Sequence, residues 1–218
     1  MDSSIELLKW LNSYLSSFIG LLPLLIGVIK YKQLSASLKL IWVYCLISLI
    51  TECILFYTFN KGINNMPLFH LFPIVEFFLF SLFYKLETRT KGSNILFWVG
   101  NFIFITLTIL NLSMIHHLFH KNTYMLAVEA MLLIIFAVTG FYYLLVREIN
   151  NPVHYSGVFW VSTSLLLYFS GSLLFFILSE FLSERNIRLY KVGWNFQETL
   201  NIVFYSLLTI PLWKSKKI

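Results

Sequence analysis

Four glutamates, Glu52, Glu76, Glu129 and Glu198, lie inside long apolar stretches of the sequence. They belong to a set of ten acidic residues, and no Lys or Arg lies deep inside the same stretches to pair with them. A charged side chain at the centre of a bilayer costs at least about 2.5–3.5 kcal/mol, so ionisable residues there face a protein interior and mark ion, proton or ligand sites. We therefore expect the four carboxyl groups to face a polar interior rather than lipid.

Further polar side chains accompany these glutamates. His70 precedes Glu76 by six residues, and Pro73 between them cannot donate the usual helical hydrogen bond. Helical spacings of three and four place Glu198 on one face of its stretch with two other polar residues. These patterns predict an acidic cavity that opens outward and binds a cation, a polyhydroxyl ligand or protons, lined by Glu52, His70, Glu76, Glu129, Glu198, Asn201 and Tyr205.

A second candidate site comes from histidines after the fourth apolar stretch. His116 and His120 are four residues apart, a spacing that can place two imidazoles on one metal ion. A divalent metal is the cofactor that this pair could hold. Retinal is excluded because the last apolar stretch has no lysine in its middle, and no nucleotide-binding glycine motif is present.

The elements that must position these residues are membrane-spanning helices. Hydrophobic residues form 58% of the 218 residues and charged residues only 12%, and the mean hydropathy is +0.77. A soluble domain carries about 25% charged residues, and a bilayer-spanning helix needs about 20 apolar residues. We predict an all-α, polytopic membrane protein, a single seven-helix transmembrane bundle over residues 1–218, with spans near 11–29, 40–59, 66–84, 95–115, 124–146, 158–181 and 194–213.

The distribution of Lys and Arg predicts the orientation of this bundle. Ten of the 16 basic residues fall on one side of the predicted spans and six on the other. Basic residues concentrate in cytoplasmic loops, so the N-terminus is predicted outside and the C-terminus in the cytoplasm, with a bacterial inner membrane as the expected location. The net charge of +6 is explained by these topology signals, and we expect no nucleic-acid partner.

Three functions fit these features. The first is a sensor or receptor-like protein that binds a ligand in the outward cavity and passes a signal to a cytoplasmic or membrane partner. The second is a small proton- or cation-coupled transporter, since protonatable groups deep in a membrane are typical of such carriers. The third is a metal-dependent lipid hydrolase within the membrane, although no sequence motif of an enzyme is present. The bilayer is the expected environment in each case, and assembly with a second copy is compatible with all three.

Overall fold

The protein is all-helical throughout the residues that the computed structural model describes, which are 3–115, 118, 123–147 and 156–215. Its α-helices are α1 (Ser3–Phe18), α2 (Leu21–Lys30), α3 (Ala36–Asn60), α4 (Met66–Thr88), α5 (Lys91–Leu110), α6 (Thr123–Arg147), α7 (Gly157–Arg185) and α8 (Ile187–Lys214). A short 3₁₀ turn at Tyr31–Gln33 follows α2, and a π-helical turn at Asn111–Ile115 follows α5.

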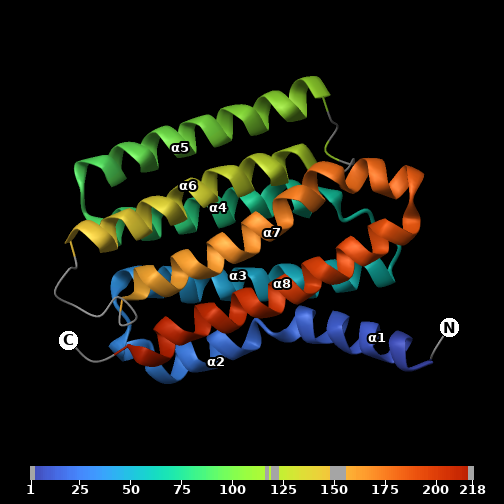
Figure 1. Cartoon of the computed structure of the whole chain (residues 1–218), viewed down its shortest axis with the longest axis horizontal. Helices are drawn as coiled ribbons and strands as arrows, with labels where there is room; N and C mark the ends of the chain where they lie inside the picture. The colour runs from blue at the N-terminus through green and yellow to red at the C-terminus, as the bar shows by residue number, and fades with distance from the viewer. Residues whose placement is uncertain (1–2, 116–117, 119–122, 148–155, 216–218) are drawn as a thin grey trace.

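The helices lie side by side along the long axis of the molecule (Figure 1). The closest neighbours are α6 with α7, α7 with α8, and α3 with α4. In Figure 1, α7 and α8 lie in front of α3, while α5 and the α1–α2 pair form opposite edges of the bundle. This arrangement encloses α4, which packs against α3, α5 and α6.

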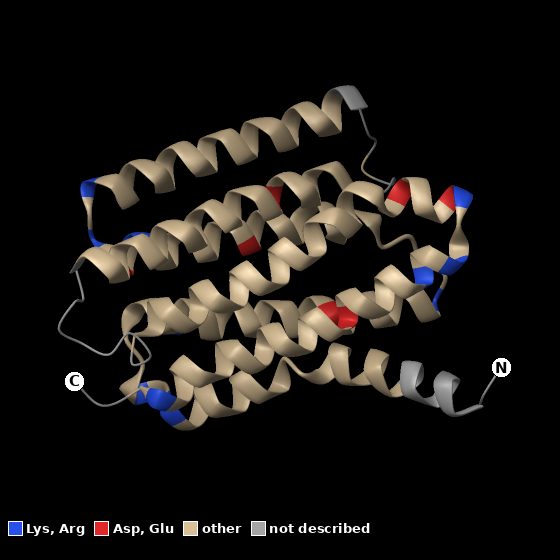
Figure 2. Ribbon diagram, in the orientation of Figure 1, with Lys and Arg blue, Asp and Glu red and all other residues tan. Residues whose placement is uncertain are grey.

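Six stretches are long and apolar enough to cross a membrane: 11–33, 36–60, 66–88, 91–113, 123–146 and 157–185. The chain is therefore a multi-pass membrane protein. Figure 2 agrees with this conclusion, because the basic residues of the described chain lie at the two ends of the bundle and none lies midway between them. The central part carries acidic residues instead, as the sequence predicts.

Two predicted boundaries differ from the structure. The first predicted span is two helices, because α1 ends at Phe18 and α2 begins at Leu21, with Gly20 before it. The predicted polar loop before the last span is reduced to Asn186, whose side chain accepts a hydrogen bond from the Leu189 amide at 3.1 Å and so begins α8. Helix α8 is not among the six apolar stretches, since polar residues interrupt its apolar pattern.

Side-chain caps also position the beginnings of α3 and α5. Ser35 accepts a hydrogen bond from the Leu38 amide at 3.2 Å at the beginning of α3. Thr90 and Ser93 form a reciprocal capping box before α5, an arrangement that satisfies two amide groups left without helical partners. Helix α4 ends at Thr88, and the φ of 47° at the next residue, Arg89, turns the chain sharply toward α5.

Aromatic side chains from five helices fill the core. On α4, Phe77, Phe80, Phe83 and Tyr84 are almost completely enclosed. They pack near rings from α5, α6, α7 and α8, at Phe104, Phe136, Phe169 and Phe204. Many large apolar side chains of the outer helix faces are exposed instead. That exposure suits a protein whose surroundings are hydrocarbon.

Candidate functional site

The centre of the candidate site is a pair of carboxyl groups from two helices. Glu76 on α4 is 7% exposed and Glu129 on α6 is 1% exposed. Their carboxyl groups lie within hydrogen-bonding reach of each other. Because an ionised carboxylate only accepts hydrogen bonds, a hydrogen bond between them requires at least one proton. We call Glu76 and Glu129 the carboxyl pair.

One oxygen of the carboxyl pair has no donor among the described residues. The Oε1 atom of Glu129 is buried and accepts no hydrogen bond from any described residue. A buried polar atom without a partner carries a large desolvation penalty, which a proton or a cation at this position would remove.

Two tyrosines connect the carboxyl pair to other helices. The Tyr44 hydroxyl of α3 donates to Glu76 Oε1 at 2.8 Å and lies 3.4 Å from the Tyr205 hydroxyl of α8. The two rings are stacked, with their planes 10° apart. The Tyr205 hydroxyl is also hydrogen-bonded to Ser48 of α3. The carboxyl pair thus belongs to a buried network that joins α3, α4, α6 and α8.

Tyr168 brings α7 into the same region. Its hydroxyl accepts a hydrogen bond from Gln197 Nε2 at 2.8 Å, and it lies close enough to Glu76, Glu129 and Glu52 to feel their charges. The Oε1 atom of Gln197 is buried and has no hydrogen-bond partner among the described residues. Polar groups of five helices therefore surround the carboxyl pair.

Glu52 lies near this network but has a different direct partner. Its carboxyl group is hydrogen-bonded to Ser17 of α1, and its side chain is only partly buried. Tyr44, Ser48 and Glu52 recur every four residues along α3, so they share one helical face. That spacing is the signal by which Tyr44, a site residue absent from the sequence prediction, could have been found.

Glu198 and Asn201 lie in a separate polar seam between α1 and α8. Ser13 Oγ and Trp194 Nε1 donate to Glu198 Oε1 at 2.8 and 3.0 Å. Asn201 Nδ2 donates to the carbonyl oxygen of Ser16 at 3.2 Å and to its hydroxyl at 3.1 Å. These contacts give Glu198 and Asn201 partners of their own, away from the carboxyl pair.

Asn201 also forms a hydrogen bond at the interruption between α1 and α2. A helix that ends leaves its last carbonyl groups without helical donors, and Asn201 supplies a donor to one of them on Ser16. A Cβ atom on Gly20 would lie 3.7 Å from the ring of Tyr205. The interruption of the first span is therefore adjacent to the tyrosine that closes the buried network.

Of the three histidines predicted as site residues, His70 lies in the described part of the chain. His70 is 2% exposed in α4, about 9 Å along the helix from Glu76 at 1.5 Å per residue. His116 and His120, predicted as metal ligands, lie outside the described residues. Within the described ranges, no three His, Cys, Asp or Glu side chains gather in a way that could hold a metal ion.

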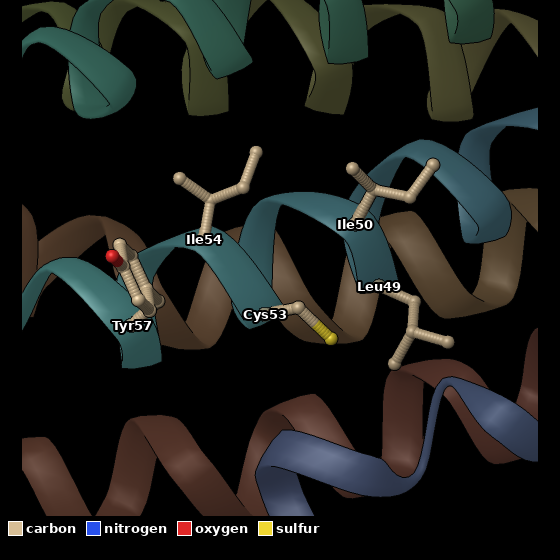
Figure 3. A pocket seen from close by; sticks show the side chains of 5 residues that line it. All are labelled: Leu49, Ile50, Cys53, Ile54 and Tyr57. Atoms are coloured by element: carbon tan, nitrogen blue, oxygen red, sulfur yellow. The ribbon is translucent and has the colours of Figure 1, made fainter.

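Two surface hollows lie away from the carboxyl pair. Figure 3 shows the first, where Leu49, Ile50, Cys53, Ile54 and Tyr57 extend from α3 alone. The second is lined by Tyr190, Lys191, Trp194 and Asn195 of α8. The first hollow is apolar and formed by one helix, so it suits an acyl chain of the bilayer better than a polar ligand.

The chain was compared with known proteins at three levels. No protein-family model matches its sequence, no curated protein matches it, and no solved structure matches its fold. We therefore infer the chemistry of the site from its geometry. Two enclosed carboxyl groups with phenols around them are suited to holding a proton or a small cation.

Proposed function

We propose that this protein is a membrane sensor of the receptor type, in which a proton or a small cation binds at Glu76 and Glu129. Binding changes the packing of the helices and passes a signal to a cytoplasmic or membrane partner. The observation that carries the proposal is the enclosed carboxyl pair with an oxygen that lacks a donor. No Lys or Arg of the described chain is hydrogen-bonded to either carboxyl group, so a mobile cation or proton is the natural counter-charge.

The hydrogen bonds around the pair supply the means of transmission. A change at Glu76 alters the acceptor of the Tyr44 hydroxyl, and Tyr44 is linked through Tyr205 to α8. Helix α8 in turn packs against α7, α2 and α1. A local change of charge at the carboxyl pair therefore reaches the helices packed around α8, which is how a sensor would pass its signal to a partner.

The proposed topology has seven membrane crossings. The α1–α2 pair forms the first crossing and α8 the last, since the 28 residues of α8 extend about 42 Å at 1.5 Å per residue. The excess of basic residues at the end that holds Lys30 and Lys214 makes that end cytoplasmic and leaves the N-terminus outside.

Transport of a proton or cation is the second candidate function, and the interrupted first span favours it. Broken helices in membrane proteins occur where the backbone is buried in protein or lines a cavity, and they form the binding sites of many transporters. Here the interruption lies against Tyr205 of the buried network.

Difference infrared spectroscopy of the protein in lipid nanodiscs tests the sensor proposal. The carboxylic C=O band should change with pH or with added Na⁺ or Ca²⁺, and Glu76→Gln and Glu129→Gln should each remove that change. Glu198→Gln is the matched control, because its carboxyl group lies in the separate α1–α8 seam. A response that survives in both Glu76→Gln and Glu129→Gln, with both variants folded, would refute the proposal.

Two further measurements separate sensor from transporter. In proteoliposomes, a proton or cation flux that Glu76→Gln abolishes would establish transport. Without such a flux, changes in hydrogen exchange at the end of α8 that follow the infrared response would support the sensor.

A further inference from the structure

One end of the bundle carries a group of lysines that come from four different segments. Lys30 ends α2, Lys32 lies in the following 3₁₀ turn, Lys39 lies near the beginning of α3, and Lys214 ends α8. We call these four residues the basic corner. Figure 2 shows basic residues gathered where the ends of α2 and α8 meet.

Three of the four lysines of the basic corner lie over aromatic rings of neighbouring elements. Lys30 Nζ lies 5.6 Å from the ring centre of Trp213, and Lys39 Nζ lies 5.0 Å from that of Tyr31. Lys214 Nζ lies 5.0 Å from the ring centre of Trp160 on α7. Tryptophan and tyrosine are enriched at the level of lipid headgroups, so these contacts place the ammonium groups at that level.

Two hydrogen bonds to Gln33 fix the arrangement of the segments that form the basic corner. Lys30 Nζ donates to the side chain of Gln33 at 3.3 Å, and Ser215 Oγ donates to the Gln33 carbonyl oxygen at 2.5 Å. The second bond ties the end of α8 to the 3₁₀ turn after α2. The positions of the lysines therefore depend on tertiary contacts between segments far apart in the sequence.

Within the described ranges, basic side chains outnumber acidic ones at the end of the bundle that holds the basic corner. Glu87 of α4 reaches this region, where its carboxylate accepts a hydrogen bond from Ser37. At the opposite end, Arg185, Arg188 and Lys191 share the α7–α8 turn with Glu180 and Glu184, and Figure 2 shows both colours together there. Counted over the described residues, the two ends thus differ in net charge as well as in the number of lysines.

We infer that the basic corner binds the headgroup of an anionic phospholipid. A phosphodiester complements several ammonium groups at headgroup level, and basic pockets between membrane helices bind such headgroups. The acyl chains would then extend along the apolar outer faces of α2 and α3. This inference does not depend on the proposed function of the carboxyl pair.

Native mass spectrometry of the detergent-solubilised full chain tests this inference, with phosphatidylglycerol and phosphatidylcholine as the probes. Phosphatidylglycerol should bind more tightly, and the preference should weaken as salt is added. Each Lys→Gln change should lower the affinity about fivefold, so the K30Q/K39Q/K214Q variant should lose about a hundredfold. The charge-preserving K30R/K39R/K214R variant should retain most of the preference.

The matched control is the R185Q/R188Q/K191Q variant, which removes three positive charges from the opposite end. Equal binding of the two lipids, or an equal loss of preference in both triple variants, would overturn the inference. If the K30Q/K39Q/K214Q variant does not fold, the single variants K30Q and K214Q in lipid nanodiscs decide the matter. Phosphatidylglycerol should raise their thermal stability less than it raises that of the unaltered protein, and an equal rise would also overturn the inference.

Discussion

The hydrogen bond from Tyr44 to Glu76 should be worth more to stability than an ordinary hydrogen bond between membrane helices. Tyr44→Phe removes only the hydroxyl that donates to Glu76 Oε1 at 2.8 Å. The Tyr205 hydroxyl keeps its bond to Ser48 in this variant, so the loss is limited to the Tyr44–Glu76 bond and the longer 3.4 Å contact with Tyr205.

The expected magnitude follows from the surroundings of this bond. Hydrogen bonds between membrane helices average about 0.6 kcal/mol and reach about 1.7 kcal/mol. Tyr44 is 3% exposed and Glu76 is 7% exposed, and a carboxyl acceptor forms stronger bonds than a neutral one. We therefore expect a coupling free energy of about 1.5 kcal/mol between the two side chains.

The assay is a double-mutant cycle with Tyr44→Phe, Glu76→Met and the double variant. Reversible unfolding in mixed micelles gives the free energy of unfolding of each. Any loss of the Glu129 interaction in Glu76→Met occurs in both variants that carry it, so it cancels to first order in the coupling term.

A matched cycle uses Tyr84 and Ser162, whose hydroxyl groups lie 2.8 Å apart in the core. This neutral pair should give a coupling of about 0.6 kcal/mol. A Tyr44–Glu76 coupling below about 0.3 kcal/mol, which is within the error of additivity, would refute the reasoning. A coupling no larger than that of the Tyr84–Ser162 pair would refute it as well.

Two further predictions concern helix packing. Gly140→Ala should lower the free energy of unfolding by about 1–3 kcal/mol, because a Cβ atom there would lie 2.5 and 2.6 Å from side chains of α7 and α4. Gly92→Ala should change it by less than about 0.5 kcal/mol, since the nearest atom lies 3.9 Å away, and equal effects in the two variants would contradict this packing. Asn201→Leu should speed hydrogen exchange and proteolysis in α1, because the Ser16 carbonyl loses its donor. Ser206→Ala, which removes a bond only within α8, should leave α1 unchanged, and similar rates in both variants would exclude the proposed role of Asn201.

The sequence was sufficient to predict a polytopic helical membrane protein and most of the helices. Apolar stretches of about 20 residues have few alternatives in a bilayer, because every backbone polar group must be satisfied within a helix. The interruption of the first span was missed, although Gly20 and Pro23 lie close together there. At that interruption, the Ser16 carbonyl accepts a hydrogen bond from Asn201, which is 185 residues away in the chain.

The candidate site shows the same division. Glu52, Glu76, Glu129 and Glu198 could be recognised individually from the sequence, because an acidic residue in an apolar stretch is costly wherever it points. Which of them meet was decided only by the rotation and packing of the helices. Tertiary structure pairs Glu76 with Glu129 and joins them to Tyr44.

The same packing places the Glu198 side chain in the polar seam between α1 and α8. Depth in the membrane can be read from position along a helix at 1.5 Å per residue. The direction in which a side chain points relative to other helices cannot be read in this way, since it depends on contacts between residues far apart in the chain.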